Sequence, residues 1–241
     1  MRPVGLFRLG AILLLLVVAV PSFLLFRRFG GGPAIVRAFL GGMGWVLGLR
    51  VRVEGRPVDR RVLYAANHSS WLDILALGGK TRARFIAKAE IQRWGLVGVL
   101  ARLGGSVFVS RDRRSATRVQ ADAVASALGE DRPVALFAEG GTGDGVLLDP
   151  FRPALFAAAV EAGVAVQPVA IDYGPRNAEM AWPDGTRFSQ EMKRILNRPG
   201  TIAATLHFLP PLDARTADRK QLATRAQAAV ADTLRRPVRV G

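Results

Sequence analysis

The sequence of 241 residues contains no cysteine. Disulfide bonds and catalysis by a thiolate are therefore excluded. Only two histidines are present, His68 and His207, so we do not expect a metal site built from histidines, and we predict no bound metal or other cofactor. Aromatic residues make up 7% of the chain, which is few for a protein that stacks nucleic-acid bases on aromatic side chains.

Lysine is also scarce, because thirty of the 34 cationic residues are arginines. With 19 acidic residues, the formal net charge is +15. A surface this basic attracts polyanions, either nucleic acid or anionic lipid. The arginines are scattered along the chain rather than gathered in a stripe between aromatic residues, which disfavours nucleic acid as a partner and favours anionic membrane lipid. A membrane-tethered nucleic-acid-binding protein is the alternative from a different functional class.

One long apolar run stands out, the uncharged stretch Leu9–Phe26. Its 18 residues are just long enough to cross a bilayer. Pro21 is expected to kink or end this helix. No small-x-small cleavage site follows the run, which disfavours a secretory signal peptide. Because more arginines follow the run than precede it, the positive-inside rule places the rest of the chain in the cytoplasm.

A second apolar segment, Ala34–Leu49, follows a glycine-rich hinge at residues 30–33. This segment either lies in or on the membrane as the partner of the first helix or forms a buried core helix. We therefore predict a membrane anchor over residues 1–49 and a second domain over residues 50–241. The second domain is expected at the cytoplasmic face of the inner (cytoplasmic) membrane.

From Val51 onward, short apolar runs alternate with stretches of helical periodicity. The predicted strands are Val51–Val53, Val62–Ala65, Phe85–Ala87, Ser106–Val109, Val134–Phe137, Val164–Ala170 and Ile202–Phe208. The predicted helices are Trp71–Leu77, Trp94–Arg102, Ser115–Leu128, Pro153–Ala162, Ser189–Leu196 and Ala217–Leu234. This alternation is typical of an α/β domain with a central, mostly parallel sheet flanked by helices. The last predicted helix and the segment Arg235–Gly241 are expected to form a basic, loosely held tail.

The stretch Asn67–Ile74 joins a predicted strand to a predicted helix. Ser70 and Asp73 match the capping box S-x-x-D, so His68 is expected in the turn before the helix. From there its imidazole can fold back onto the carboxylate of Asp73, whereas residues five apart on one helix would not meet. A histidine oriented by a carboxylate can act as a general base. The spacing alone also fits a plain helix cap, so the neighbouring motifs decide.

Three further stretches follow predicted strands, where ligands of parallel sheets bind. The first, Gly104–Arg111, leads into a cluster of arginines. The second, residues 137–145, is dense in glycine, and the backbone N–H groups of such a loop can approach an anion closely. The third, Val166–Ala170, contains Pro168, which indicates an edge strand or a bend at the active site. The chain has no P-loop, and Phe108 stands where a nucleophile elbow needs glycine, which disfavours a serine hydrolase.

In this order, the motifs resemble the glycerophospholipid acyltransferase superfamily, which includes the bacterial 1-acylglycerol-3-phosphate acyltransferases. The resemblance runs from about residue 45 to about residue 212. The matching residues are Asn67, His68, Ser70 and Asp73 for N-H-x-S-x-x-D, Phe108–Arg111 for an apolar strand ending in arginine, Phe137, Glu139 and Gly140 for F-P-E-G-T-R, and Val166–Ala170 for an apolar run with proline. Four motifs in the same order make the resemblance specific.

The resemblance implies a reaction and a role for each matching residue. His68 would take the proton from an acceptor hydroxyl, which attacks an acyl thioester directly, and Asp73 would orient His68. No acyl-enzyme is expected. The residues implied to hold the acceptor head group are Arg111, Glu139, Gly140, Gly141 and Thr142. Lys88 could stabilise the oxyanion, although a solvated lysine is the commoner role at such a position.

The third motif departs from the family pattern, because Glu139-Gly140-Gly141-Thr142 stands in place of E-G-T-R. The arginine that helps to grip a phosphate is missing. Either Arg111 and Arg113 compensate, or the acceptor is not lysophosphatidate. The loop is similar to that of the branch that acylates lyso-ornithine lipid, whose head group is zwitterionic. Asp144 would then face the ornithine amine, or it would form an Asx turn.

The resemblance therefore implies transfer of a fatty acyl group from acyl-carrier-protein or acyl-CoA to the free hydroxyl of a lysolipid. The expected acceptor is 1-acylglycerol-3-phosphate, which would give phosphatidic acid, and lyso-ornithine lipid is the alternative. His207 lies inside a predicted strand and is expected to be structural.

Overall fold

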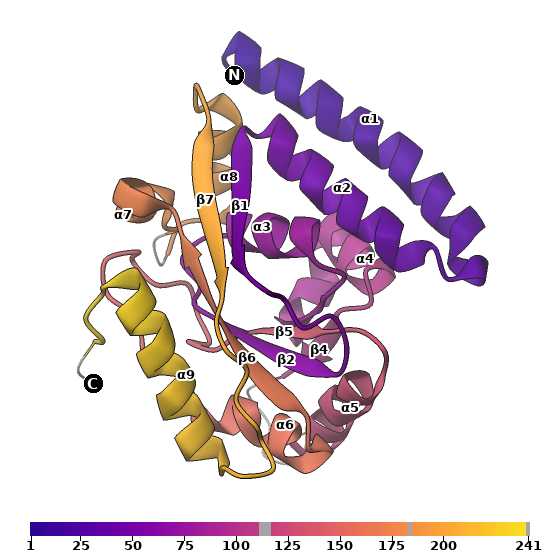
Figure 1. Cartoon of the computed structure of the whole chain (residues 1–241). Coiled ribbons are helices and arrows are strands. Elements are labelled where there is room, and N and C mark those ends of the chain that lie inside the picture. The colour runs from indigo at the N-terminus through magenta and orange to yellow at the C-terminus, as the bar shows by residue number, and fades with distance from the viewer. Residues whose placement is uncertain (111–116, 183–184, 240–241) are drawn as a thin grey trace.

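The computed structural model describes the chain except residues 111–116, 183–184 and 240–241. A seven-stranded sheet forms its centre, in the order β1-β7-β6-β2-β5-β3-β4 (Figure 1). The strands are β1 (Leu49–Gly55), β2 (Val62–Ala66), β3 (Arg84–Lys88), β4 (Val107–Val109), β5 (Val134–Phe137), β6 (Ala165–Asp172) and β7 (Ile202–Phe208). Each overlaps a strand predicted from the sequence.

The sheet is mostly parallel, as predicted. Strands β6, β2, β5, β3 and β4 pair in parallel, so their carboxyl ends lie along one edge of the sheet. Strand β7 is antiparallel to β6, and β1 is parallel to β7. These two strands therefore run opposite to the rest of the sheet. The turn that carries His68 follows β2, which lies in the middle of the strand order.

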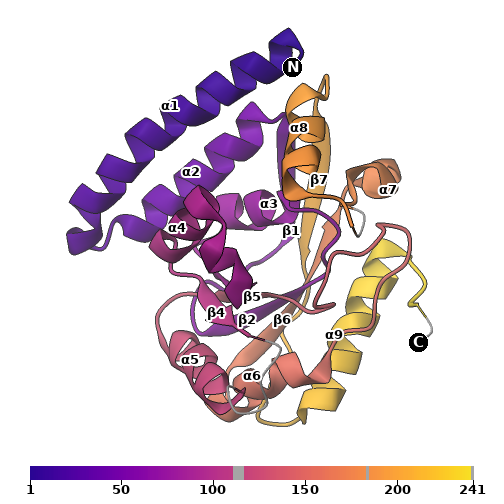
Figure 2. The ribbon, with the colours of Figure 1, turned by 180° about the vertical axis from the view of Figure 1, so that it is seen from behind.

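Helices cover both faces of the sheet (Figures 1 and 2). The helices are α1 (Pro3–Phe26), α2 (Gly32–Val46), α3 (Leu72–Lys80), α4 (Gly95–Leu103), α5 (Thr117–Gly129), α6 (Ala157–Ala162), α7 (Asn177–Met180), α8 (Phe188–Asn197) and α9 (Arg219–Leu234), with short 3-10 turns between some of them. The predicted helix over residues 153–162 is a 3-10 turn followed by α6. Helix α7 was not predicted, because four residues are too few to show a helical period.

Strand β2 explains why two helical layers are needed. All five of its residues are buried, and they alternate between two cores. Val62 and Tyr64 belong to the core shared with α3 and α8, whereas Leu63 and Ala65 belong to the core shared with α5, α6 and α9. Burial of each large apolar side chain stabilises the fold by about 1.5–3 kcal/mol. An uninterrupted apolar strand therefore requires cover on both sides.

Helix α1 is long and apolar enough to cross a membrane, and none of its apolar window is buried in the structure. Pro21 lies inside this helix and does not end it. The first turns of α1 are fixed to the rest of the protein by Arg8, which is only 6% exposed. Its guanidinium donates to the carbonyls of Ile195, Leu196 and Arg198, at the end of α8. The last carbonyls of a helix lack the full set of intrahelical partners, so Arg8 supplies donors to the end of α8.

Helix α2 is the second apolar segment, predicted either as the membrane partner of the first helix or as a core helix. It contacts both α1 and α3 (Figure 2). Its backbone meets α3 closely at Gly41, because a Cβ atom on Gly79 would lie 2.7 Å from the Gly41 Cα atom. The segment leaves the helix after Val46, and Leu49 already begins β1.

The structure corrects two expectations from the sequence. Of the two alternatives for Pro168, an edge strand or a bend at the active site, the edge strand is wrong, because β6 lies between β7 and β2. Pro168 lies between the bridge that joins Val166 to Leu212 and the start of the ladder with β7 at Val169. The pairing on this side of β6 is interrupted at Pro168, so the missing N–H of proline removes no ladder hydrogen bond.

The expectation of a loosely held tail was also wrong, because α9 buries Leu222, Ala223, Ala226 and Val230 and the described residues after it are attached to the protein. Val238 forms a bridge with Leu148, and the carbonyl of Pro237 accepts from the Leu148 N–H at 3.0 Å.

Candidate active site

The candidate site lies at the carboxyl ends of β2, β5 and β6. Asn67 links two of these ends. Its side-chain N–H group donates to the Ile171 carbonyl at 3.0 Å, and its side-chain oxygen accepts from the Ile171 N–H at 2.7 Å. Asn67 thus continues the pairing of β2 with β6 beyond the ladder. The chain that follows Asn67 is therefore held in one place as it turns into α3.

The carboxylate of Asp73 organises this turn. Its Oδ2 atom accepts from the backbone N–H groups of Ser69 and Ser70 and lies 2.9 Å from the Nδ1 atom of His68. Helix α3 begins at Leu72, and the Ser70 hydroxyl accepts from the Leu72 N–H instead of the Asp73 N–H. The capping interaction is therefore only half of the predicted box. The contact between His68 and Asp73 is present as predicted.

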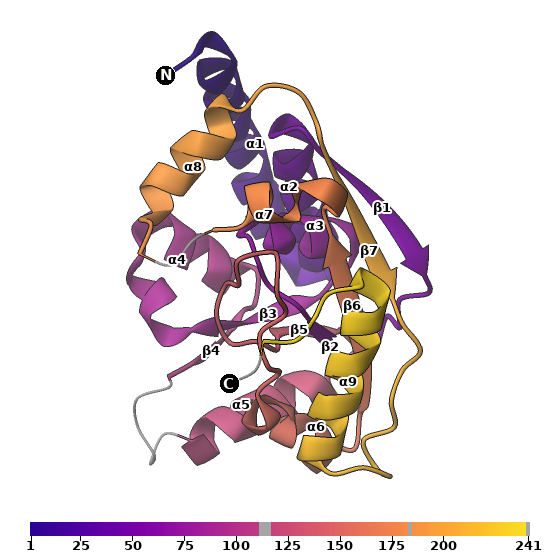
Figure 3. The same cartoon turned by 90° about the vertical axis from the view of Figure 1, so that its left-hand side faces the viewer.

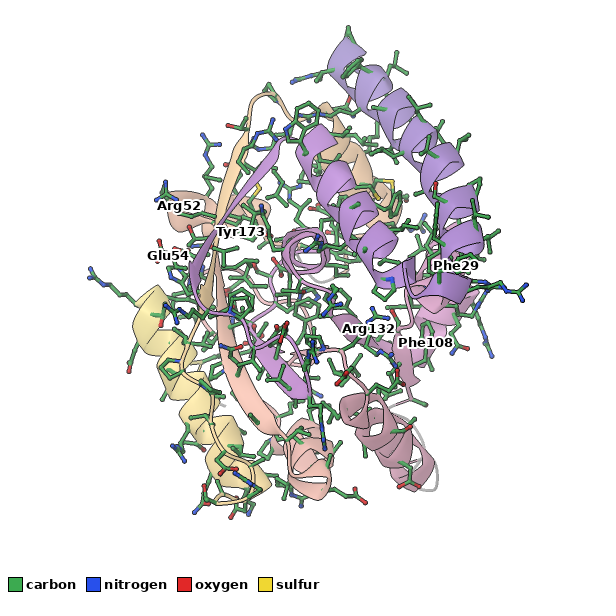
Figure 4. The ribbon with its side chains drawn as sticks, turned by 45° about the vertical axis from the view of Figure 1, so that its right-hand side comes forward. Phe29, Arg52, Glu54, Phe108, Arg132 and Tyr173 are labelled. Atoms are coloured by element: carbon green, nitrogen blue, oxygen red, sulfur yellow. The ribbon has the colours of Figure 1, made fainter. Side chains whose placement is uncertain are left out.

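Tyr173 completes the environment of Asp73. Its hydroxyl donates to the Oδ1 atom of Asp73 at 2.5 Å. The Asp73 side chain is fully buried, so all its hydrogen bonds are shielded from water and strengthened. Burial, followed by the charge of Asp73, raises the pKa of Tyr173 well above its ordinary value, so the hydroxyl remains a donor. Figure 4 shows Tyr173 among the interior side chains.

The ring of His68 is held in one orientation. It stacks on Phe137 with 3.8 Å between ring centroids and 13° between planes, and the side chain is 15% exposed. A carboxylate beside Nδ1 favours the tautomer with its proton on that atom. The lone pair then lies on Nε2, which is the arrangement a general base needs.

The backbone of His68 is fixed by the glycine-rich loop after β5. The N–H of His68 donates to Glu139 Oε1 at 2.5 Å, and its carbonyl accepts from the Gly143 N–H at 2.7 Å. The other oxygen of Glu139 accepts from the Asp149 N–H at 2.8 Å. Burial raises the pKa of Glu139 to about 8, against the opposing effect of the two backbone hydrogen bonds. Glu139 is therefore turned toward the backbone and holds His68 in position.

The glycines of this loop are required at particular places. Gly140 has φ +77°, and a Cβ atom there would lie 2.8 Å from the Arg152 Nε atom, which donates to the Glu139 carbonyl. A Cβ atom on Gly143 would lie 3.2 Å from Glu139 Oε2. Gly141 is exposed and no atom lies within 4 Å of its Cβ position. Thr142 is half-buried between them.

Within the described part of the chain, no hydrogen bond joins Asp144 or Lys88 to His68, Asp73 or Glu139. Asp144 forms the Asx turn, since its Oδ1 atom accepts from the N–H groups of Val146 and Leu147. Its other oxygen is bound by Arg239. Lys88 ends β3 with an exposed side chain, on the same edge of the sheet as His68. Arg111 lies outside the described residues.

Three residues near the site were missed from the sequence. Tyr173 directly follows β6. A polar side chain at the carboxyl end of an apolar strand is a signal that could have identified it. Arg236 and Arg239, beyond α9, carried no such signal.

His207 pairs with Glu54 at 3.0 Å between neighbouring strands, in agreement with a structural role. Within the described ranges, no group of three or more His, Asp or Glu residues is placed to hold a metal ion.

Comparison with known proteins gives a consistent result. The sequence model of the family described as Acyltransferase matches residues 50–172. The chain is 35% identical over 194 residues to a lyso-ornithine lipid O-acyltransferase of Rhodobacter capsulatus, covering 77% of this chain and 70% of that protein. It is 38% identical over 151 residues to a 1-acyl-sn-glycerol-3-phosphate acyltransferase of Neisseria gonorrhoeae, covering 59% of each.

A solved structure shares the fold. The 1-acyl-sn-glycerophosphate acyltransferase of Thermotoga maritima superposes with a TM-score of 0.68 over 96% of both chains, at 23% identity. The match covers nearly the whole of both chains, so the two proteins share the fold.

Proposed function

The chain belongs to the acyltransferase family, and from this premise we propose that it esterifies lyso-ornithine lipid with a fatty acyl group, using His68 as the general base. The observation that carries the proposal is the contact of 2.9 Å between the Nδ1 atom of His68 and the Oδ2 atom of Asp73. It directs the lone pair of the imidazole to Nε2. This geometry supports the roles that the resemblance implied for these two residues.

The reaction follows from this arrangement. Nε2 of His68 takes the proton of the acceptor hydroxyl as its oxygen attacks the thioester carbonyl. Asp73 stabilises the imidazolium that forms. The tetrahedral intermediate then collapses, the C–S bond breaks, and the imidazolium returns the proton to the departing thiolate. The products are an ester and a free thiol, and no bond to the protein is made.

Glu139 and Gly143 act on His68 as positioning residues in this proposal. They hold its backbone from both sides, so the imidazole does not need to be ordered when substrate binds. Keeping a catalytic group in its reactive geometry lowers the entropy cost of reaction. Glu139 thus contributes through His68 rather than by contact with the head group.

The charges around the site favour a zwitterionic acceptor. Among the residues that the structure describes, the carboxyl groups in this region belong to Asp73, Glu139, Asp144, Asp149 and Asp172, and the guanidinium groups belong to Arg152, Arg236 and Arg239. Because burial raises the pKa of Glu139 to about 8, the negative charge at neutral pH comes mainly from the four aspartates. A region rich in acids repels a phosphate dianion more than a head group that also carries an ammonium. Ornithine carries such an ammonium beside its carboxylate. The missing arginine of the third motif points the same way.

Lysophosphatidate is the second candidate acceptor. The similarity to the Neisseria gonorrhoeae protein favours it, and the arginines at positions 111, 113 and 114 could bind a phosphate.

The acyl donor is a thioester of acyl carrier protein or coenzyme A. Helix α1 and its exposed apolar side chains would place the site at the cytoplasmic face of the membrane, where a lysolipid is met. Lys88 and Arg111 are proposed to contact substrate.

The general base is tested by a pair of matched substitutions. We expect His68→Ala to lower acyl transfer by roughly 10²–10⁴-fold, while His207→Ala, the same change at the other histidine, leaves activity within about twofold of wild type. Purified proteins would be assayed with a labelled acyl thioester in lipid vesicles. Activity of His68→Ala within a few fold of wild type would refute the assignment.

The acceptor is tested by offering lyso-ornithine lipid and lysophosphatidate in parallel to the wild-type protein. The proposal predicts the larger kcat/KM for lyso-ornithine lipid. A larger value for lysophosphatidate would establish the second candidate instead, and no transfer to either lipid would reject both.

A further inference from the structure

The segment after α9 is attached to the loop that follows the third motif. The N–H of Arg239 donates to the Leu148 carbonyl at 2.8 Å, and Leu148 in turn donates to Pro237. Figure 3 shows this segment turning back from the end of α9 toward that loop. The attachment brings two arginines, at positions 236 and 239, beside the carboxyl groups of the proposed site.

These two arginines are in different states. Arg239 is fully engaged, because its Nε atom donates to Asp149 Oδ1 at 2.6 Å and its Nη2 atom donates to Asp144 Oδ2 at 2.5 Å. The side chain of Arg236 is only 9% exposed, yet its buried Nη2 atom donates no hydrogen bond to any residue that the structure describes. Arg239 therefore fixes the segment, and Arg236 carries a buried cation with an unused donor.

The surroundings of Arg236 are those of the active site. Its nearest carboxyl group is Asp172, at 3.6 Å, and the charges of Glu139, Asp73 and Asp144 also act on it. Burial lowers the pKa of Arg236, while these carboxyl groups raise it. An arginine still keeps its charge under these conditions.

A purely structural pairing with Asp172 does not account for Arg236. The Oδ1 atom of Asp172 already accepts from the Gly174 N–H at 2.9 Å and from the side chain of Asn177 at 2.7 Å. A distance of 3.6 Å is too long for a hydrogen bond, although a buried donor normally has a partner. The free donor lies near Asp172, the residue before the Tyr173 that bonds to Asp73, and this position indicates a group that arrives with substrate.

We propose that Arg236 is a specificity-determining residue that binds the oxyanion of the acceptor head group, in place of the arginine missing from the third motif. The proposal rests on the proposed function. The oxyanion is the carboxylate of ornithine or the phosphate of lysophosphatidate, and a guanidinium can bind either with two donors. The cation thus comes from a segment almost one hundred positions beyond the motif in the sequence. Arg239, in the same segment, bonds to Asp144, which lies 95 residues before it.

The test compares Arg236→Gln and Arg236→Lys with Arg225→Gln in the full-length protein. Arg225 is an exposed residue of α9, so its substitution makes the same change of net charge away from the site. We expect Arg236→Gln to raise the KM for lyso-ornithine lipid by about 10- to 100-fold, as the loss of a charge-assisted hydrogen bond predicts. The KM for the acyl donor should change by less than about threefold. Arg236→Lys should fall between wild type and Arg236→Gln.

A second acceptor isolates the contact itself. The methyl ester of lyso-ornithine lipid lacks the negative charge of the carboxylate. Wild type should therefore bind the ester as weakly as Arg236→Gln binds the acid. The ratio of kcat/KM between wild type and the variant should then fall to about one, as in a double-mutant cycle. A ratio that is the same for the acid and the ester would overturn the proposal, because it would show a role independent of the oxyanion.

Each outcome separates the two claims. Wild type that acylates neither lipid refutes the proposed function. Wild type that acylates one of them while Arg236→Gln keeps its KM refutes the role of Arg236 alone. If lysophosphatidate is the acceptor, its KM should rise in the variant by the same factor. If Arg236→Gln has a much lower unfolding midpoint, the comparison of acid with ester is made with Arg236→Lys instead. A ratio of kcat/KM between wild type and Arg236→Lys that is the same for the acid and the ester would also overturn the proposal.

Discussion

The turn around His68 and the loop around Glu139 are built in opposite ways. In the turn, Asp73 binds groups that lie three to five residues before it. In the loop, Glu139 binds a group 71 residues away, and Asp144 and Asp149 bind Arg239, at separations of 95 and 90 residues. The pairing of His68 with Asp73 is thus formed within one short segment, whereas Glu139, Asp144 and Asp149 are bonded to segments from distant parts of the chain.

This difference teaches which changes the two regions tolerate. A local network forms wherever its short segment is placed, so its reactivity depends on a few atoms. A network of remote segments depends on the fold that brings them together, so substitutions there are expected to alter stability as well as activity. The predictions below test this division, from the largest expected effect to the smallest.

The largest effect is expected for Asp73→Asn. An amide cannot accept from every group that now converges on Asp73, and it does not stabilise an imidazolium. We expect acyl transfer to fall by roughly 10²–10⁴-fold, and the free energy of unfolding to fall by about 1–3 kcal/mol because a buried donor loses its partner. The matched control is Asp122→Asn at an exposed position. A stability loss without a loss of kcat would show that Asp73 is only a helix cap.

A smaller effect is expected for Tyr173→Phe, which removes only the hydroxyl that donates to Asp73. The reorientation of Asp73 should lower kcat by about 3- to 30-fold, which corresponds to about 0.6–2 kcal/mol. The other tyrosine provides the control, because the hydroxyl of Tyr64 donates to the Val58 carbonyl and lies in the core away from His68. Tyr64→Phe should lower stability alone. Equal kcat values for the two variants would contradict the role of Tyr173.

The sequence was informative where bonds are local. The contact of His68 with Asp73 was predicted because a turn before a helix can bring residues five apart together. The bond between Tyr173 and Asp73 spans 100 residues, and no periodicity or cap reports it. The inward orientation of Glu139 was missed for the same reason, since its partners are backbone groups that only the folded sheet brings near.

The strands were predicted well because each is a short apolar run with its own boundaries. The environment of Pro168 was not, because proline is usually found at edges and the irregular junction with β7 is a property of the assembled sheet. The segment after α9 was also misjudged. Its charges suggested a solvated tail, but the acids that bind Arg239 lie elsewhere in the chain.

The next prediction is an effect on stability rather than on activity, and it concerns pH and Glu139. Burial raises its pKa to about 8 in the folded protein, above the ordinary value of about 4.3 in an unfolded chain. Between these pH values the folded state holds a proton that the unfolded state has released, so this group makes stability fall as pH rises. Glu139→Gln cannot titrate. The thermal unfolding midpoint of Glu139→Gln, measured relative to wild type, should therefore rise between pH 5 and pH 9. The expected rise is a few degrees, which corresponds to about 1–3 kcal/mol in the free energy of unfolding.

The comparison to make is between Glu139→Gln and Glu161→Gln, since the second changes a glutamate of α6 far from His68 along the chain. The midpoint of Glu161→Gln should follow that of wild type across the pH range. A difference between Glu139→Gln and wild type that stays constant with pH would show that Glu139 is ionised in the folded protein throughout.

The most direct test of the central claim, that the acceptor is zwitterionic and that the loop lacks a phosphate grip, is the ratio of kcat/KM for lyso-ornithine lipid to that for lysophosphatidate, before and after Thr142→Arg. This substitution restores the arginine of the common family pattern beside His68. The account predicts a ratio above one for wild type and a fall of about tenfold or more in Thr142→Arg. A wild-type ratio below one that Thr142→Arg leaves unchanged would contradict it.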